Sequence, residues 1–399
     1  MRLRPTGCGV TLSTRPLEAG EAAGAARRAA LSFGSQPDEE LVEQWRARIA
    51  SGQVIGVVDD GEVLGHCRVT AVDHWFGGRR VPTQHIASVA VPPEHRGRGV
   101  ASALMRALII DGQRAGLGLS LLFPATTRLY RKLGWEHAGA LQSYRLDARR
   151  ATVGGPVMRA VDGDRDWAAI LACYERCARA TTAAAVRDDE LWQRRREAPY
   201  AYVLPGATAG TVDAYVLFAH AHAPGDWQYT IQVEDWAATT ADGLRAVVGL
   251  VAAHGTVGKD ARFRDGVPDR WSLLLGEPDV RPDGGMFWMA RGLDLPTAIA
   301  CRGFPPGLSG TATLAVDDPL LDAASGPWRL EVAAGEGRLT PAADAEVMLD
   351  ARAVGPLFTG FRSPAELAVA GVLLRGSQEA LAWLTGAFAG PPPTLVDFF

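Results

Sequence analysis

The segment that decides the fold is Val89-Ala-Val-Pro-Pro-Glu-His-Arg-Gly-Arg-Gly-Val-Ala-Ser102, which joins a strand to a helix through a basic, glycine-rich turn. Residues 86–91 are apolar and rich in β-branched side chains, so they are predicted to form a buried strand, and the two prolines that follow end it. From residue 101 to residue 109 the apolar positions have the spacing of an amphipathic helix.

This order of strand, turn and helix favours a phosphate-binding site. The first turn of a helix has unpaired N–H groups and the positive end of the helix dipole. Gly97 and Gly99 let the backbone approach an anion closely, and Arg96 and Arg98 add positive charge. The alternative for a glycine-rich stretch alone is a plain tight turn. The stretch is neither a Walker A loop, because Lys-Ser/Thr does not follow Gly99, nor a complete Gly-x-Gly-x-x-Gly dinucleotide fingerprint.

A second strand–helix pair follows along the chain. Residues 119–123 are predicted to form a strand, 124–127 to break it and offer a helix N-cap, and 127–133 to form a short helix that Gly134 ends. Tyr130 lies on this short helix. From the helix alone, its simplest role is to cover the edge of a core.

Together these segments resemble the GNAT acetyltransferases. The pattern Val89-x-Val-Pro-x-x-x-Arg-x-x-Gly-x-Ala is similar to motif A of that family, which binds the pyrophosphate of acetyl-CoA, and Tyr130-x-x-x-Gly-Trp is similar to its Tyr-x-x-x-Gly-Phe segment. The resemblance implies that the parallel strands at Val89 and Leu121 splay apart and open a slot for the pantetheine arm. It also implies that Tyr130 gives a proton to the leaving thiolate.

Composition narrows the possible functions. The chain has 399 residues, enough for two or three domains, and its hydrophobic content of 47% is ample for buried cores. A net charge of −4 argues against a general nucleic-acid-binding surface. With no signal-like apolar segment and no run of 18 apolar residues, a cytoplasmic protein without a membrane partner is expected. The five cysteines lack Cys-x-x-Cys spacing, so neither a disulfide framework nor a zinc site is indicated: Cys8, Cys67, Cys173, Cys177 and Cys301.

Residues 1–150 are predicted to form a first α/β (α+β) domain. Its expected order is β–α–α–β–β–β–α–β–α–β, which is the order of the GNAT fold. The elements before the glycine-rich turn are a strand at 10–13, helices at 17–33 and 38–50, and strands at 53–58, 63–72 and 81–91. Residues 141–146 are expected to close this domain as its last strand.

Residues 151–290 are predicted to form a second, degenerate GNAT-like domain. Helices are expected at 164–179, 188–196 and 240–254, and strands at 201–204, 214–219 and 229–234. The order of elements echoes the first domain, but the Arg-x-x-Gly-x-Ala signature is absent, so the copy is expected to lack a cofactor site. His220 and His222 share a strand face and could ligate a metal, but no third ligand is evident.

Residues 291–399 are predicted to form a third domain. A helix is expected to begin within 291–296, followed by four short strands and then three helices. The strands are expected at 310–316, 328–332, 337–339 and 345–350, and the helices at 351–359, 364–370 and 377–387. Strands followed by helices resemble the sterol carrier protein fold, which binds lipids elsewhere, so a bound apolar ligand is a rival interpretation.

The C-terminus is unusually apolar for a chain end. Residues 387–393 contain three consecutive prolines and are expected to be a stiff linker, which presents Thr394-Leu-Val-Asp-Phe-Phe399. Chain ends normally fray and are polar, so this one is expected to dock in a pocket. It serves either as a simple hydrophobic tether or to place the terminal carboxylate of Phe399 where a base is needed.

The whole chain resembles the Eis (enhanced intracellular survival) family, with a catalytic GNAT domain, a degenerate one and a sterol-carrier-like domain ending in phenylalanine. The resemblance implies acetyl-CoA as co-substrate, no metal, Tyr130 as general acid and the Phe399 carboxylate as general base. Family members form hexamers and acetylate amines, including aminoglycosides and, in some cases, lysine side chains. The implied cofactor contacts are Val89, Ala90, Val91, Gly97, Arg98, Gly99, Val100, Ala101, Ser102, Ala125 and Thr126.

The chain departs from this family at its penultimate residue, which is often acidic there and is Phe398 here. Asp397 and Asp294 are therefore the candidates to bind a cationic substrate, although Asp294 could equally cap a helix before Pro296. The expected reaction is direct transfer of the acetyl group to a primary amine, of aminoglycoside or polyamine type. The alternatives are a protein lysine acetyltransferase and a non-catalytic regulatory protein that binds acetyl-CoA or lipid.

Overall fold

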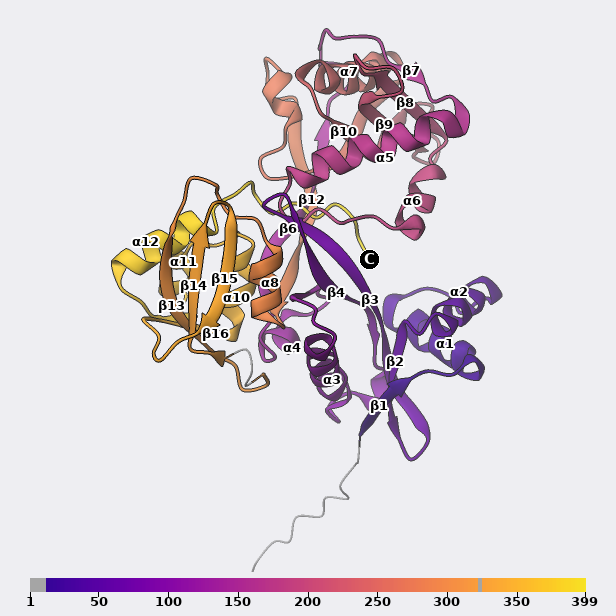
Figure 1. Cartoon of the computed structure of the whole chain (residues 1–399). Coiled ribbons are helices and arrows are strands. Elements are labelled where there is room, and N and C mark those ends of the chain that lie inside the picture. The colour runs from indigo at the N-terminus through magenta and orange to yellow at the C-terminus, as the bar shows by residue number, and fades with distance from the viewer. Residues whose placement is uncertain (1–11, 322–324) are drawn as a thin grey trace, which may run out of the picture.

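The computed structural model of the chain describes residues 12–321 and 325–399 (Figure 1). Cys8 and the first two residues of the strand predicted at 10–13 lie outside the described residues, and the first described strand is β1 (Ser13–Pro16). Within the described residues, no helix is both long and apolar enough to cross a lipid bilayer.

One twelve-stranded sheet runs through the first two thirds of the chain, in the order β1-β2-β3-β4-β5-β12-β6-β11-β10-β9-β8-β7. The strands from the N-terminal part of the chain are β2 (Val54–Asp59), β3 (Glu62–Phe76), β4 (Arg79–Ala90), β5 (Leu119–Leu122) and β6 (Glu136–Leu146). Those from the following part are β7 (Arg159–Ala160), β8 (Tyr200–Pro205), β9 (Val212–His222), β10 (Tyr229–Ala238), β11 (Gly258–Asp265) and β12 (Val280–Gly292).

The α-helices of these parts form where the sequence predicts them, and the short 3-10 helices η2 and η4 were not predicted. Asp38 begins the second helix because its side chain accepts a hydrogen bond from the Leu41 N–H, and the alanine-rich helix before it buries its alanines against Trp45. The first set is η1 (Ala19–Glu21), α1 (Ala22–Phe33), α2 (Glu39–Ala50), η2 (Pro93–His95), α3 (Val100–Arg114) and α4 (Thr127–Arg131). The second set is α5 (Gly163–Arg179), α6 (Asp189–Arg196), α7 (Ala241–Ala252), η3 (Ala253–Thr256) and η4 (Trp271–Leu274).

Strand β12 corrects the expected topology. It lies between β5 and β6, so β6 does not close the first sheet as expected but pairs with β11 and β12. The sequence analysis assigned no strand to β12 because Pro282 and Gly285 interrupt its alternation, and the pairing shifts register between them. Arg291, expected at the start of a helix, lies in this strand, and the helix α8 (Leu295–Cys301) begins after it. The two repeated units thus exchange their last strands.

Each unit contains one pair of parallel strands that separates partway. In the first unit β4 and β5 pair only from Thr83–Leu119 to Ile86–Leu122, and residues 87–90 of β4 have no partner on β5. In the second unit β10 and β11 pair over residues 229–232 and then separate. The first separation was implied by the family resemblance.

The third part of the chain packs beside β12. It has a five-stranded sheet in the order β15-β14-β13-β16-β17, and its core is continuous with that of the first unit through contacts such as Phe76 with Phe358. Its strands are β13 (Gly310–Asp317), β14 (Trp328–Ala333), β15 (Glu336–Pro341), β16 (Val347–Asp350) and β17 (Leu373–Arg375), and its further helices are α10 (Ala351–Phe358), α11 (Pro364–Val369) and α12 (Gln378–Ala387).

The chain end docks against the first two units, as its apolar sequence predicts. The Thr394 N–H donates to the Thr182 carbonyl at 2.8 Å, Thr394 bridges to Ala140 of β6, and Leu395 is fully buried. The C-terminus thereby lies between β3 and β4 on one side and α6 on the other (Figure 1).

Candidate active site

The glycine-rich turn leaves the start of α3 open for an anion. Gly97 and Gly99 have φ angles of +76° and +82°, a conformation that L side chains rarely adopt, and a Cβ on either would meet nothing within 4 Å. Gly99 is the N-cap residue of α3, so no side chain binds the first N–H groups of the helix, and its first turn contains no acidic residue. Arg96 donates to the Val91 carbonyl at 3.0 Å, which fixes the turn to the strand end. The predicted pyrophosphate contacts at 97–102 therefore fit such a group.

The strand before this turn contains a strained residue, Ser88, which was not predicted. Ser88 has a φ angle of +51°, and the pairing of β4 with β3 shifts register nearby, between His66 and Arg68. A bulge of this kind redirects the end of a strand. Val89, Ala90 and Val91 follow Ser88. On the side that faces β5 they have no strand partner, because the pairing of β4 with β5 ends at Ile86. Their backbone groups therefore border the opening between the two strands.

Tyr130 lies in a setting suited to a proton donor. Its side chain is buried on α4 and packs against Trp135, with ring centroids 6.2 Å apart. Burial, with a smaller contribution from Cys67, raises the pKa of Tyr130 to about 12, so the phenol keeps its proton at neutral pH. Ala125 and Thr126 lie just before this helix, where Thr126 is the N-cap residue but makes no side-chain capping bond.

A buried arginine from β12 fixes the end of the Tyr130 helix. Arg291 donates to the Leu133 carbonyl and is held by an ion pair with Asp318 at 2.7 Å. The next residue, Gly134, has a φ angle of +91°, and a Cβ there would collide with the Arg291 guanidinium. Gly134 thus ends the helix as predicted, and the arginine explains why no larger residue fits.

The last residue of the chain reaches the opening between β4 and β5. The ring of Phe399 stacks on His85 of β4 at 3.6 Å between centroids, and lies 5.3 Å from Phe123, which directly follows β5. Phe398 also contacts Phe123 but stays half exposed. A cavity of about 300 Å³, here called the acceptor cleft, borders this chain end; it is lined by residues that include Arg68, His85, Asp188, Glu190, Asp397 and Phe399.

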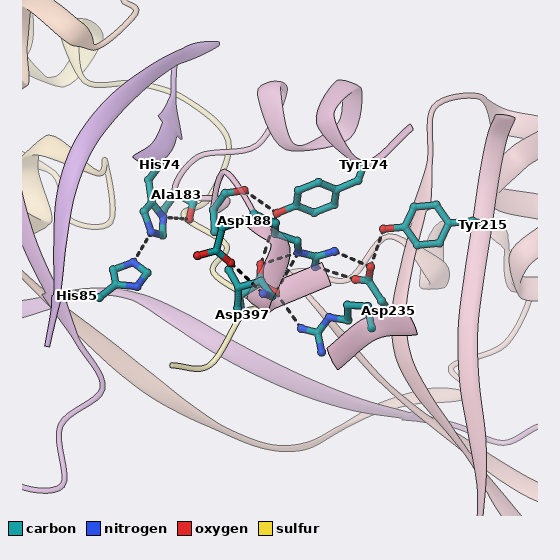
Figure 2. Close-up of polar contacts among 12 residues, drawn as sticks. His74, His85, Tyr174, Ala183, Asp188, Tyr215, Asp235 and Asp397 are labelled. Atoms are coloured by element: carbon teal, nitrogen blue, oxygen red, sulfur yellow. Dashed lines mark hydrogen bonds and ion pairs between the residues drawn. The ribbon is translucent and has the colours of Figure 1, made fainter. Parts of the chain in front are cut away.

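Two buried histidines lie beneath the terminal residue. His74 Nε2 and His85 Nε2 are 2.6 Å apart, and His74 Nδ1 is 2.8 Å from the Ala183 carbonyl (Figure 2). A carbonyl only accepts, so His74 carries its proton on Nδ1, and His85 then donates from Nε2. Burial lowers the pKa of His74 to about 4 and that of His85 well below its ordinary value, so both rings are neutral. The register of β3 against β4 brings them together, and neither was predicted.

Asp397 is held by the second unit. Both of its carboxylate oxygens lie 3.0 Å from Arg187 Nε, and Arg195 donates to one of them at 2.8 Å. Burial raises its pKa, but the two guanidinium groups outweigh burial, so the pKa of Asp397 lies below its ordinary value. The expectation that Asp397 binds a cationic substrate is wrong, because two arginines of the chain already occupy its carboxylate (Figure 2).

Comparison with known proteins agrees with this architecture. Two acetyltransferase (GNAT) domain models match residues 13–138 and 183–291, and a sterol carrier protein domain model matches residues 295–396. The N-acetyltransferase Eis of Mycobacterium tuberculosis (strain ATCC 25177 / H37Ra) is 26% identical, over 93% of this chain and 95% of that protein. The chain belongs to the Eis-like GNAT acetyltransferases.

Solved structures agree with this assignment. A GCN5-related N-acetyltransferase from Kribbella flavida is 29% identical, with a TM-score of 0.85 and coverage of 98% of this chain and 99% of that one. Eis1 from Mycobacterium abscessus is 23% identical and shares the fold, with a TM-score of 0.79 and coverage of 98% and 100%. The chain is therefore a GNAT-type N-acetyltransferase, a class that uses acetyl-CoA.

The second GNAT fold closes the places that the first leaves open. Its helix α7 begins at Thr240, whose side chain accepts from the Gly243 N–H at 3.0 Å, and Asp242 adds a negative charge to the first turn. Between the separated ends of β10 and β11, the Trp236 indole N–H donates to the Arg264 carbonyl at 3.0 Å. The cap and Asp242 thus stand where a pyrophosphate would bind in the first fold, and the Trp236 bridge crosses the equivalent of its strand opening.

The remaining polar candidates serve local structure. Asp294 accepts a hydrogen bond from the Thr297 N–H and another from its hydroxyl, so the helix-cap alternative for Asp294 is confirmed. His220 stacks on Tyr229 with centroids 4.0 Å apart. Within the described residues no group of three or more His, Cys, Asp or Glu side chains could hold a metal ion, so the structure offers His220 and His222 no further ligands.

The sterol-carrier-like domain has little internal space. Its apolar cavity measures about 40 Å³ and is lined by residues such as Leu314, Phe358 and Phe388. Pockets for small molecules usually measure ~300–1,000 Å³. This cavity is too small for a sterol, which argues against an apolar ligand bound there.

Proposed function

We propose that the chain transfers the acetyl group of acetyl-CoA directly to a primary amine. The observation that carries this proposal is the position of Phe399. Its ring stacks on His85 and lies beside Phe123 at the opening between β4 and β5. A chain end in that position brings its carboxylate to the cleft where the acceptor amine must meet the thioester. The uncapped first turn of α3 next to this opening suits the pyrophosphate of the cofactor.

In this mechanism the terminal carboxylate of Phe399 takes a proton from the incoming ammonium group, directly or through a water molecule. The free amine then attacks the acetyl carbon. Backbone N–H groups at Val89 to Val91 polarise the carbonyl oxygen, and the buried phenol of Tyr130 protonates the departing sulfur. The Tyr130 phenol is protonated at neutral pH, so it has a proton to give when the thiolate leaves.

We propose an aminoglycoside or another polyamine as the acceptor. The two exposed carboxylates at the acceptor cleft already have partners, because Asp188 accepts from the Leu191 N–H at 2.9 Å as the N-cap of α6. Glu190 pairs with Arg68 at 2.7 Å and also with Arg194, which lines the same cleft. Phe398 also supplies no charge at a position that is often acidic in the family. These features favour an acceptor with few positive charges over a heavily charged one.

Thiol release from acetyl-CoA tests the proposal across aminoglycosides, linear polyamines and lysine peptides. We expect turnover with small amines, and Tyr130→Phe should lower kcat by roughly 10²-fold with an unchanged KM for acetyl-CoA. Tyr144→Phe is a matched control, because this phenol donates to the Gly266 carbonyl away from the opening. Full activity of Tyr130→Phe would remove the general-acid role, and turnover only with lysine peptides would assign a protein substrate.

A further inference from the structure

A buried cluster of four charges joins the second GNAT fold to the end of the chain. Arg187 binds Asp235 through Nη1 and Nη2 at 2.6 and 2.9 Å, and binds Asp397 through Nε (Figure 2). Arg195 completes a balanced set, and Tyr215 donates to Asp235 at 2.6 Å. The Arg187 and Asp397 side chains are 0% and 2% exposed.

Burying these charges contributes little net free energy to the stability of the fold. Removing ions from water is costly, and well-packed apolar residues often replace a buried ion pair without loss of stability. What a guanidinium adds is geometry, because its planar set of donors fixes the direction of each carboxylate it binds. The cluster therefore specifies where Asp397 lies relative to β10, which carries Asp235.

The segment 182–187 connects this cluster to the histidine pair under the terminal ring. Its Thr182 carbonyl accepts from the tail at Thr394, and its Ala183 carbonyl accepts from His74, which positions His85. The same segment pairs with β3, since the Ala183 N–H donates to the Trp75 carbonyl at 2.7 Å. One short stretch of the second unit thus holds the tail, Asp397 and the support of the Phe399 ring.

We propose that Asp397 is a positioning residue, and that the second GNAT fold serves as a clamp that sets the location of the terminal carboxylate two residues later. This inference rests on the proposed role of the Phe399 carboxylate as the base. Tethering at Asp397 by Arg187 and Arg195, with stacking of Phe399 on His85, leaves the last two residues little freedom. The alternative is that the cluster only holds the units together.

Two substitutions separate the length of the anchor from its charge. Asp397→Glu keeps the charge but adds one methylene between the backbone and the arginines, whereas Asp397→Asn keeps the length and removes the charge. If Asp397 positions the base, Asp397→Glu should lower kcat at least tenfold and alter the acidic limb of the pH–rate profile. Its KM for acetyl-CoA and its unfolding temperature should stay at the wild-type values. Asp226→Glu, at a partly exposed ion pair with Lys259, is the matched control.

A glycine inserted between Asp397 and Phe398 tests the same inference with the cluster intact. We expect a loss of turnover of at least tenfold, because the carboxylate moves relative to a fixed anchor. This variant keeps the test decisive if Asp397→Glu does not fold. Wild-type kcat and pH profile in the insertion variant would overturn the positioning role.

A glycine appended after Phe399 distinguishes failure of this inference from failure of the proposed function. If the appended variant is inactive while the insertion and Asp397→Glu variants are fully active, only the clamp is refuted. If the appended variant is fully active, the carboxylate is not the base, and the positioning role falls with it.

Discussion

The two GNAT folds of this chain differ most at equivalent helix starts. Helix α3 follows two open glycines and lacks a capping side chain, whereas α7 is capped by Thr240 and has Asp242 in its first turn. The neighbouring strand openings differ in the same way. That of the first fold receives only the end of the chain, and that of the second is bridged by Trp236. The second fold shares the architecture of the first, but hydrogen bonds within the chain stand where the first leaves a helix start open.

The two folds differ in what their strand ends and helix starts contact. In the first, backbone groups left without partners are available to a ligand, at some cost to stability. In the second, a cavity bordered by β10 is also lined by Thr394 and Val396, so the chain's own tail lies beside the separated strands. The second fold therefore holds a part of the protein where its counterpart is expected to hold a cofactor.

Arg187→Met should have the largest effect, because it removes the centre of the clamp. It leaves Asp235 and Asp397 buried without their shared partner, and breaking a buried ion pair in this way costs about 3–5 kcal/mol of folding free energy. The folded pKa of Asp397 lies below its ordinary value of 3.8, so its ion pairs stabilise the fold above that pH and this contribution is lost as pH falls. Urea unfolding at pH 7 and pH 3.5 should show a deficit that shrinks at the lower pH. A pH-independent deficit would contradict the assignment.

The local features of this site were predictable and the distant ones were not. Gly97, Gly99 and Tyr130 lie within short segments whose residue order predicts the turn and the helices that hold them. Arg187 and Asp397 are 210 residues apart, and no periodicity links them.

Histidines 74 and 85 illustrate the same limit over a shorter distance. They meet only because β3 and β4 pair in one register, which the hairpin turn at 77–78 sets and the sequence pattern leaves open. Strand β12 was not predicted because Pro282 and two glycines interrupt its alternation of apolar and polar residues. This strand comes from the second unit and pairs with β5 of the first. Contacts across an exchanged strand depend on the whole fold and leave no trace in a local pattern.

Gly99→Thr should have an intermediate effect, because it gives α3 the residue type that caps α7. Threonine at a φ angle of +82° is strained by ~1–2 kcal/mol, and its side chain adds bulk to the open turn where the pyrophosphate would bind. We expect the dissociation constant for coenzyme A to rise at least tenfold in calorimetry. Gly116→Thr, at a φ angle of +71° and equally open, is the matched control for strain alone. Equal affinities in the two variants would show that the turn at 97–99 does not bind the cofactor.

Thr240→Gly should have the smallest effect, and it asks whether uncapping α7 is enough to restore a site. Replacing a threonine N-cap by glycine costs only a few tenths of a kcal/mol, because glycine tolerates the cap conformation. We expect no binding of coenzyme A to the second fold. Asp242 still repels a phosphate at the helix start, and Trp236 still bridges the strands where the pantetheine arm would pass. Calorimetry should therefore give one binding event per chain, as in the wild type. A second event would mean that the threonine cap alone separates the two folds, and that the tail and the indole leave room for a ligand.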